Sequence, residues 1–282
     1  MEPINLTYCV PFFGAMFFAS LGAYKDVMME DFNLSSFLRE FIFGMIGFAC
    51  LWWVSVTTIQ PPIIIFWMFI AIIRTMTEGY KWFFRVEHQT KYKIPSTVHI
   101  MGKSTHCIKT RIVVMLGCLL LIGATAWVGL SLALVGQKKS IPMYVIGSII
   151  GLIVGLLCAA GGGYKDGFFE GFDGIKFWRS PIIAMICGMF IYPMSGGNVI
   201  VTMIAVLGLE RMISELWKTF HSPCACHNVS KCYCPGKFKD DLCNDPPYKH
   251  DWCKKRNIFL ALISVSLLFM GILICTYNKT KL

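Results

Sequence analysis

Charge is what this sequence has little of. Only 15% of its 282 residues are charged, whereas soluble domains carry about 25% charged residues. Hydrophobic residues make up 56% of the chain, and they gather in segments of roughly 20 residues, the length that crosses a bilayer as a helix. This composition argues against an ordinary soluble domain and predicts an integral membrane protein whose main partner is the lipid bilayer.

Several recognisable signals are also missing. The chain has no Walker loop, no dinucleotide fingerprint, no HExxH sequence and no nucleophile elbow, which argues against the enzyme classes built on them. The first ten residues, MEPINLTYCV, carry no basic region, so we expect no cleaved signal peptide. The net charge of +10 comes from basic residues between apolar segments. We therefore relate it to membrane topology and expect no nucleic-acid partner.

What the chain does contain is an internal repeat, which we name the YKD motif. Residues 22–39 read GAYKDVMMEDFNLSSFLR, and residues 162–179 read GGYKDGFFEGFDGIKFWR. Aligned without a gap, they share seven identical polar or aromatic residues in 18 positions, besides the glycine pair Gly22 and Gly162. The identical pairs are Tyr24 and Tyr164, Lys25 and Lys165, Asp26 and Asp166, Glu30 and Glu170, Phe32 and Phe172, Phe37 and Phe177, and Arg39 and Arg179. Such agreement at polar and aromatic positions indicates an internal duplication.

A second similarity, which we name the REK segment, extends the repeat. Shifted by three residues, Arg74, Glu78, Lys81 and Phe83 align with Arg211, Glu215, Lys218 and Phe220. Each half then contains four helical segments, and an even number of spans gives both halves the same orientation. The sequence predicts an all-α polytopic membrane protein of about eight transmembrane helices, arranged as two parallel four-helix repeats at 1–137 and 141–282. Nine spans, or six with re-entrant segments, are the alternatives.

The eight segments follow the apolar pattern and its breaks. They cover about 9–22, 41–59, 63–84, 112–136, 143–161, 181–194, 199–220 and 257–277. Gln60-Pro61-Pro62 and Ser195-Gly-Gly-Asn198 predict the turns within each helical hairpin.

The distribution of basic residues predicts which ends of the helices face the cytosol. Of the 26 Lys and Arg residues, only four lie on the side that would carry both termini, namely Lys138, Lys139, Lys279 and Lys281. Short loops rich in Lys and Arg stay in the cytosol. We therefore expect the motif side to be cytosolic and both termini to be outside or lumenal.

The charged residues of both motifs are the candidate substrate or ion site. They are Lys25, Asp26, Glu30, Arg39, Arg74 and Glu78, with their counterparts Lys165, Asp166, Glu170, Arg179, Arg211 and Glu215. Carboxylates four residues apart share a helix face and suit a cation or a proton, whereas Lys and Arg suit a phosphate, with or without a divalent ion. A charge at mid-bilayer costs about 2.5–3.5 kcal/mol. The alternative is a structural network of ion pairs, with the arginine and glutamate of each REK segment neutralising each other.

Glycine is concentrated in the fifth segment, at Gly151, Gly155 and Gly161–163. Small residues allow helices to pack closely in lipid, and glycine-rich breaks also occur at transporter sites. We expect close packing, with a broken helix before Tyr164 as the alternative.

A cysteine-rich loop occupies 221–256 in the second half only. Its cysteines are Cys224, Cys226, Cys232, Cys234, Cys243 and Cys253. A cytosolic location favours zinc as a cofactor of these thiols, although the two Cys-x-Cys pairs do not have a standard zinc-finger spacing. Three disulfides are the alternative for the opposite side, and unliganded or palmitoylated thiols are the third interpretation.

Together these features predict a transporter or channel for a small ion or solute, because both halves carry nearly intact charged clusters. An intramembrane lipid-phosphate enzyme is the first alternative, but an enzyme rarely needs two equal sites. A non-catalytic scaffold with a cytosolic cysteine-rich loop is the second. Assembly into a homo-oligomer, the membrane of residence and the transported species are left open.

The predicted topology can be checked through the loop at 221–256. In sealed vesicles with the cytosolic face outward, a zinc chelator should free the cysteines of this loop from metal. A membrane-impermeant maleimide should then label them. Labelling that occurs only after detergent and a reductant are added would invert the topology and favour disulfides over zinc.

Overall fold

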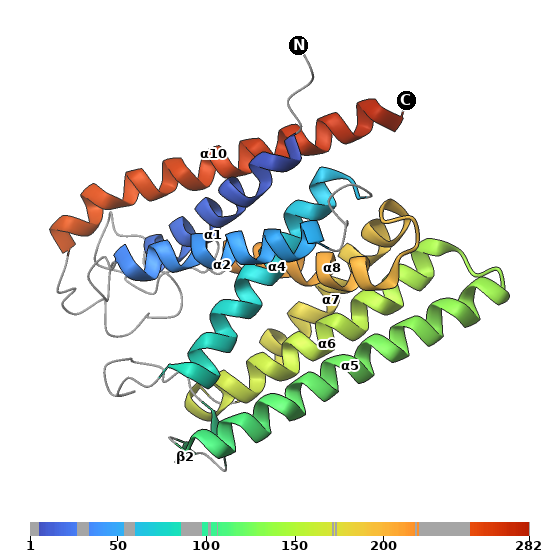
Figure 1. Cartoon of the computed structure of the whole chain (residues 1–282), viewed down its shortest axis with the longest axis horizontal. Coiled ribbons are helices and arrows are strands. Elements are labelled where there is room, and N and C mark those ends of the chain that lie inside the picture. The colour runs from blue at the N-terminus through green and yellow to red at the C-terminus, as the bar shows by residue number, and fades with distance from the viewer. Residues whose placement is uncertain are drawn as a thin grey trace. The chain divides into compact units, whose positions relative to one another are not determined.

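The computed structural model is all-α apart from one small hairpin (Figure 1). It describes residues 6–26, 34–53, 60–85, 98–100, 103–105, 107–170, 172, 174–217, 219 and 249–281. The helices are η1 (Leu6–Cys9), α1 (Val10–Asp26), α2 (Leu34–Trp53), α4 (Pro62–Gly79), the π-helix η2 (Tyr80–Phe84), α5 (Ile108–Lys138), α6 (Met143–Glu170), α7 (Gly174–Met194), α8 (Val199–Leu216) and α10 (Lys249–Lys281). Strands β1 (His99–Ile100) and β2 (Lys103–Ser104) pair antiparallel.

Six helices of the described part are long and apolar enough to cross a membrane. They are α2, α4 with η2, α5, α6 as far as Tyr164, α7, and the Asn257–Thr276 part of α10. This confirms the prediction of a multi-pass, all-α membrane protein. The apolar part of α1 is shorter, and α8, which includes Glu210, Arg211 and Glu215, is not among the six. The count of eight spans therefore stays a prediction.

The predicted hairpin turns have visible causes. Helix α4 begins at Pro62, where the missing N–H of proline costs nothing because the first turn has no acceptor for it. Between α7 and α8, Gly196 and Gly197 adopt φ values of 68° and 78°, which glycine accepts without a steric penalty. Asn198 Oδ1 then accepts a hydrogen bond from the Val201 amide at 3.1 Å and caps the first turn of α8.

The chain forms two compact units. Unit 1 comprises Met1–Ile73 and Arg211–Leu282, and unit 2 comprises Arg74–Glu210. Two helices are thereby divided between the units, α4 after Ile73 and α8 after Glu210. The halves predicted from the sequence, 1–137 and 141–282, follow different boundaries and stay a prediction about the origin of the chain.

In unit 2, the backbones of α6 and α7 touch. Gly147, Gly151 and Gly155 recur every fourth residue on α6 and face Gly188, Ala184 and Pro181 of α7. A Cβ at position 155 would lie 2.5 Å from the Cα of Pro181, and one at 151 would overlap the carbonyl oxygen of Ala184. Any side chain larger than hydrogen therefore separates the helices, and close packing at Gly151 and Gly155 is confirmed.

The triple glycine of α6 has a different setting. Open space surrounds Gly161 and Gly162, and α6 continues as a helix through Gly161–163. The alternative of a broken helix before Tyr164 is therefore not what the structure contains.

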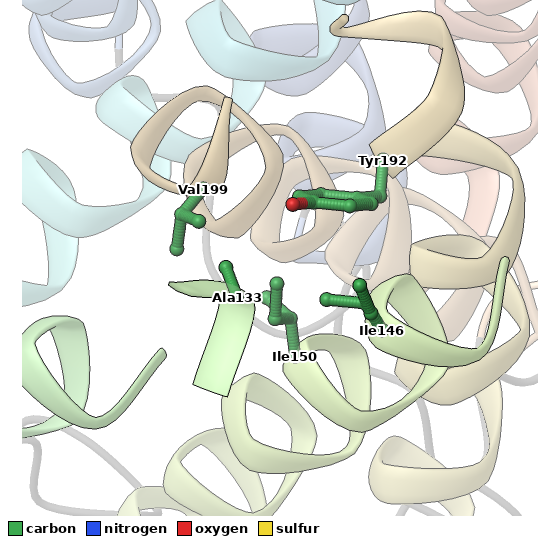
Figure 2. Close-up of a cluster of buried hydrophobic side chains, with 5 residues drawn as sticks. All are labelled: Ala133, Ile146, Ile150, Tyr192 and Val199. Carbon is green, nitrogen blue, oxygen red and sulfur yellow. The ribbon is translucent and has the colours of Figure 1, made fainter. Parts of the chain in front are cut away.

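The core of unit 2 joins four helices. Figure 2 shows Ala133 of α5, Ile146 and Ile150 of α6, Tyr192 of α7 and Val199 of α8 converging on one another. Small residues again permit the approach, because a Cβ at Gly136 of α5 would lie 2.7 Å from Ile146 Cδ1. The same cluster fixes the antiparallel arrangement of α5 and α6 within the unit.

In unit 1, α1 packs against both α2 and α10. The ring of Phe69 lies against Gly14 of α1 and Gly44 of α2, whose Cβ positions would fall 2.5 and 2.8 Å from ring carbons. Phe13 of α1 stacks on Phe269 of α10, with ring centroids 4.1 Å apart. Residues 63–71 of α4 are all buried, so the apolar start of α4 is surrounded by protein on every face.

We predict that Gly151→Ala destabilises the protein, whereas Gly161→Ala does not. Both changes add one methyl group to the same helix, but only the first meets backbone atoms of α7. Overpacking of this kind costs about 1–3 kcal/mol, and alanine at an open helical position gains about 0.5–1 kcal/mol over glycine. Thermal unfolding in detergent measures the difference, and equal Tm values for the two variants would contradict the close contact.

Candidate functional site

Three charged side chains form a cluster at the end of α4, in unit 2. Arg74 Nη1 lies 3.1 Å from Glu78 Oε1, and Lys81 Nζ lies 3.6 Å from the same oxygen. The spacings of four and three residues place all three on one face of the helix. The local neutralisation expected from the sequence is therefore present. Exposed fractions of 25% for Arg74 and 22% for Glu78 leave the cluster accessible without full solvation.

At this cluster the α-helix ends and a π-helix follows. Tyr80–Phe84 form one turn of π-helix, which ends where the Arg85 amide donates to the Tyr80 carbonyl at 3.0 Å. Turns of this type are rare and often occur at functional sites because they re-aim side chains. Here the turn carries Lys81 and Trp82.

Trp82 brings the cluster to the second YKD motif. Its ring lies 6.0 Å from the ring of Tyr164, measured between centroids, at 47°. Tyr164 lies near the end of α6 and is 49% exposed. In unit 2, the first REK segment therefore contacts the tyrosine of the YKD motif of the other half.

An arginine that the sequence did not single out fixes this arrangement. Arg111, in the first turn of α5, is 4% exposed. Its Nη1 donates to the Arg85 carbonyl and its Nε to the Thr105 carbonyl, both at 2.9 Å. The end of η2 and the β1–β2 segment are therefore tied to the start of α5. Arg111 stands among the basic residues at the start of α5, which is a visible feature of the sequence. Composition does not reveal, however, that its side chain binds two backbone carbonyl groups.

The cluster places two cations around one carboxylate, and the turn that carries Lys81 also carries a buried donor. Arg74 and Lys81 both contact Glu78. Among the described residues, Trp82 has a buried Nε1 without a hydrogen-bond partner. Buried donors are rarely left unsatisfied, because each costs about 1–3 kcal/mol. This combination suits a ligand with negative charge and acceptor oxygens.

The second REK segment lies on α8, in unit 1. Arg211 and Glu215 have the same four-residue spacing, and Glu215 is 4% exposed. The neighbouring Glu210, which has the apolar Ile73 as its counterpart, is fully buried. Thr219 is also fully buried and donates its hydroxyl to the Glu215 carbonyl at 2.7 Å.

The remaining candidate residues are less fully described. Arg39 lies on α2 and Arg179 on α7. Lys25 and Asp26 end α1, and Lys165, Asp166 and Glu170 lie in the last turns of α6, with side chains outside the described part. Glu30, Cys224, Cys226, Cys232, Cys234 and Cys243 lie outside the described residues, as does the side chain of Cys253 in α10. The zinc site thus stays a prediction.

Comparison with known proteins adds nothing to this description. No protein-family model matches the chain, and neither does any curated protein or solved structure. Function has to be argued from the geometry of the residues.

We predict that Cys107, the residue before α5, is alkylated at lower pH than an unperturbed cysteine. The Thr110 amide, then the Thr110 hydroxyl and the Lys109 amide, lower the pKa of this exposed thiol below its ordinary value, because a helix N-terminus stabilises the thiolate. A lower pKa keeps the thiolate populated to lower pH, so the midpoint of alkylation should lie below that of free cysteine. Peptide mapping after pulsed alkylation measures this midpoint. Thr110→Val should raise it, and an unchanged profile would contradict the assignment.

Proposed function

We propose that this chain is a membrane transporter or channel for a small anion or a phosphate-bearing solute, built from two parallel four-helix repeats. The charged cluster of Arg74, Glu78 and Lys81 carries this proposal. It places two cations around one carboxylate, all partly exposed, at the end of an otherwise apolar helix. Intramembrane charge of this kind marks solute pathways in membrane proteins.

The helix boundaries support the duplication. Helix α2 begins at Leu34 and α7 at Gly174, 140 positions later. Helix α4 runs from Pro62 to Gly79 and α8 from Val199 to Leu216, so both ends are displaced by 137 positions. These are the two displacements at which the YKD motifs and the REK segments align.

The compact units support it further. The division of α4 after Ile73 and the division of α8 after Glu210 are also 137 positions apart. In unit 1, α1 packs against α2 and α10, and in unit 2, α6 packs against α7 and α5. Each unit therefore combines the first two helices of one half with the last helix of the other half. A duplicated chain that exchanges its last helices has this pattern.

One pair of contacts repeats at the level of single residues. In unit 1, a Cβ at Gly44 of α2 would lie 3.4 Å from the Cβ of Ala15 of α1. The equivalent positions in unit 2 are Ala184 of α7 and Gly155 of α6, where the corresponding distance is 2.9 Å. Glycine and alanine have changed places, but each pair keeps one methyl group between the helices. Compensation of this kind is expected when two copies of one hairpin diverge while keeping their packing.

We choose an anion over a cation because of the two ion pairs that Glu78 makes. Both Arg74 and Lys81 contact the same carboxylate oxygen, so this carboxylate is already neutralised and is a poor ligand for a cation. A carboxylate between two cations instead holds them in place and reduces the cost of burying them. Two partly exposed cations around one carboxylate attract an incoming anion more readily than a cation.

Flux through purified protein in liposomes tests the proposal. Proteoliposomes should take up a small anion, such as chloride or inorganic phosphate, faster than empty liposomes. Arg74→Gln should lower kcat/KM for that anion by about tenfold or more, because it removes a partly buried charge. Glu78→Gln should lower KM for the anion, whereas a cation carrier would lose transport.

Three results would overturn the proposal. They are an absence of flux for every anion tested, flux of cations alone, and wild-type kinetics in both variants. Conversion of a lipid phosphate headgroup by the same proteoliposomes in the presence of magnesium would favour the enzyme alternative instead.

A further inference from the structure

We propose that the two copies of the charged site are not equivalent, and that the copy in unit 2 binds a phosphate group through Trp82 while the copy in unit 1 serves the fold. This inference rests on the proposed function, which it narrows to one site and one ligand class. The residues that carry it come from both halves of the sequence.

The site in unit 2 is shared between the halves. Arg74, Glu78 and Lys81 belong to the first half, and the partner of Trp82 is Tyr164 of the second half. Arg111 fixes the end of η2 from the start of α5. The cluster, the aromatic pair and the buried arginine therefore lie at one end of unit 2. Neither half of the sequence contains the whole site.

Equivalent residues of the two copies differ in accessibility. Tyr164 is 49% exposed, whereas its counterpart Tyr24 is 1% exposed. Glu78 is partly exposed, whereas its counterpart Glu215 is buried. A small solute reaches the first member of each pair more readily than the second. Each pair has the same residue type, so the difference in exposure comes from the surrounding structure.

The copies also differ in the donor that each one offers. Trp82 aligns with Thr219 at the displacement of the REK segments. Among the described residues, Trp82 Nε1 is buried and has no hydrogen-bond partner. Thr219 is fully buried, and its hydroxyl already donates to the Glu215 carbonyl. Only the copy in unit 2 therefore has a donor at this position without an acceptor.

A phosphate group fits this set of residues. Its oxygens accept hydrogen bonds, so one of them satisfies the indole N–H of Trp82, while Arg74 and Lys81 supply positive charge. Chloride offers charge without directional acceptor oxygens and gains less from the indole. The shared chemistry is a phosphate, whether on a free solute or on a lipid headgroup.

Equilibrium binding to the full-length protein tests the inference with matched variants. Inorganic phosphate is titrated against protein in nanodiscs of zwitterionic lipid. Trp82→Phe keeps the aromatic ring but removes the N–H, and should weaken phosphate binding by about tenfold. Thr219→Val is the matched change in unit 1 and should leave the phosphate affinity unchanged. Chloride affinity should be similar in wild type and Trp82→Phe.

The source of the phosphate is separated by a second arm. If the ligand is a free solute, wild type binds inorganic phosphate and Trp82→Phe binds it more weakly. If the ligand is a headgroup, nanodiscs containing phosphatidic acid should stabilise wild type, measured as Tm, and stabilise Trp82→Phe less. Either result supports a phosphate site at Trp82. Equal responses of wild type and Trp82→Phe in both arms would overturn it, as would a loss in Thr219→Val equal to that in Trp82→Phe.

A ligand-free measurement tests the contact between the halves. In a double-mutant cycle on Tm, Trp82→Leu and Tyr164→Leu should be non-additive, because the two rings touch. Trp82→Leu and Tyr24→Leu should be additive, and the reverse pattern would overturn the shared site. Phosphate binding that depends on Trp82 without any flux would reject transport but keep this inference. Anion flux that is unchanged in Trp82→Phe would support transport but overturn this inference.

Discussion

The close contact between α6 and α7 is the constraint on which unit 2 depends. Apolar helices in lipid gain nothing by hiding from their surroundings, so their association relies on close packing and polar contacts. Glycine at every fourth position of α6 allows its backbone to touch that of α7, which fixes the helices in register. That register determines how deep Arg179 and Tyr164 lie, since each follows its helix rigidly. The position of Tyr164, the aromatic partner of Trp82, is thus set by residues that carry no charge.

The same requirement explains the form of the proposed duplication. Unit 1 keeps the helix contact with alanine and glycine exchanged, as Ala15 and Gly44 in place of Gly155 and Ala184. Helices α4 and α8 each start in one compact unit and end in the other, and the change comes directly before Arg74 and Arg211. The apolar start of α4 is enclosed by protein, whereas its charged end has the partly open surroundings that charge needs. In α4, the apolar run of the sequence therefore ends at Arg74, the residue at which the helix passes into the other unit.

The charged side chains at the end of α4 neutralise one another in part. Glu78 holds Arg74 and Lys81 together, which reduces the cost of keeping either cation away from water. The following turn adds an indole donor, Trp82, whose ring contacts the exposed Tyr164. In unit 1, Tyr24 and Glu215, the counterparts of Tyr164 and Glu78, are buried. Two copies of one motif can diverge in this way, one towards binding and the other towards stability.

The sequence by itself determined the membrane class, the turns at Pro62 and Gly196, the Arg74–Glu78 pair and the approximate positions of the apolar helices, although α2 and α7 begin seven residues earlier than hydropathy predicted. All of these depend on residues within one short window, through hydropathy, helical period or backbone preference. Only the tertiary structure decided that Trp82 contacts Tyr164 of the other half, that Arg111 holds two carbonyl groups, and that Tyr24 is buried while Tyr164 is exposed. The motifs around these two tyrosines are nearly identical, so no local pattern could separate them. Which helices pair in lipid depends on shape complementarity along whole helix faces, where many arrangements have similar hydropathy, and that choice is made only when the chain is folded.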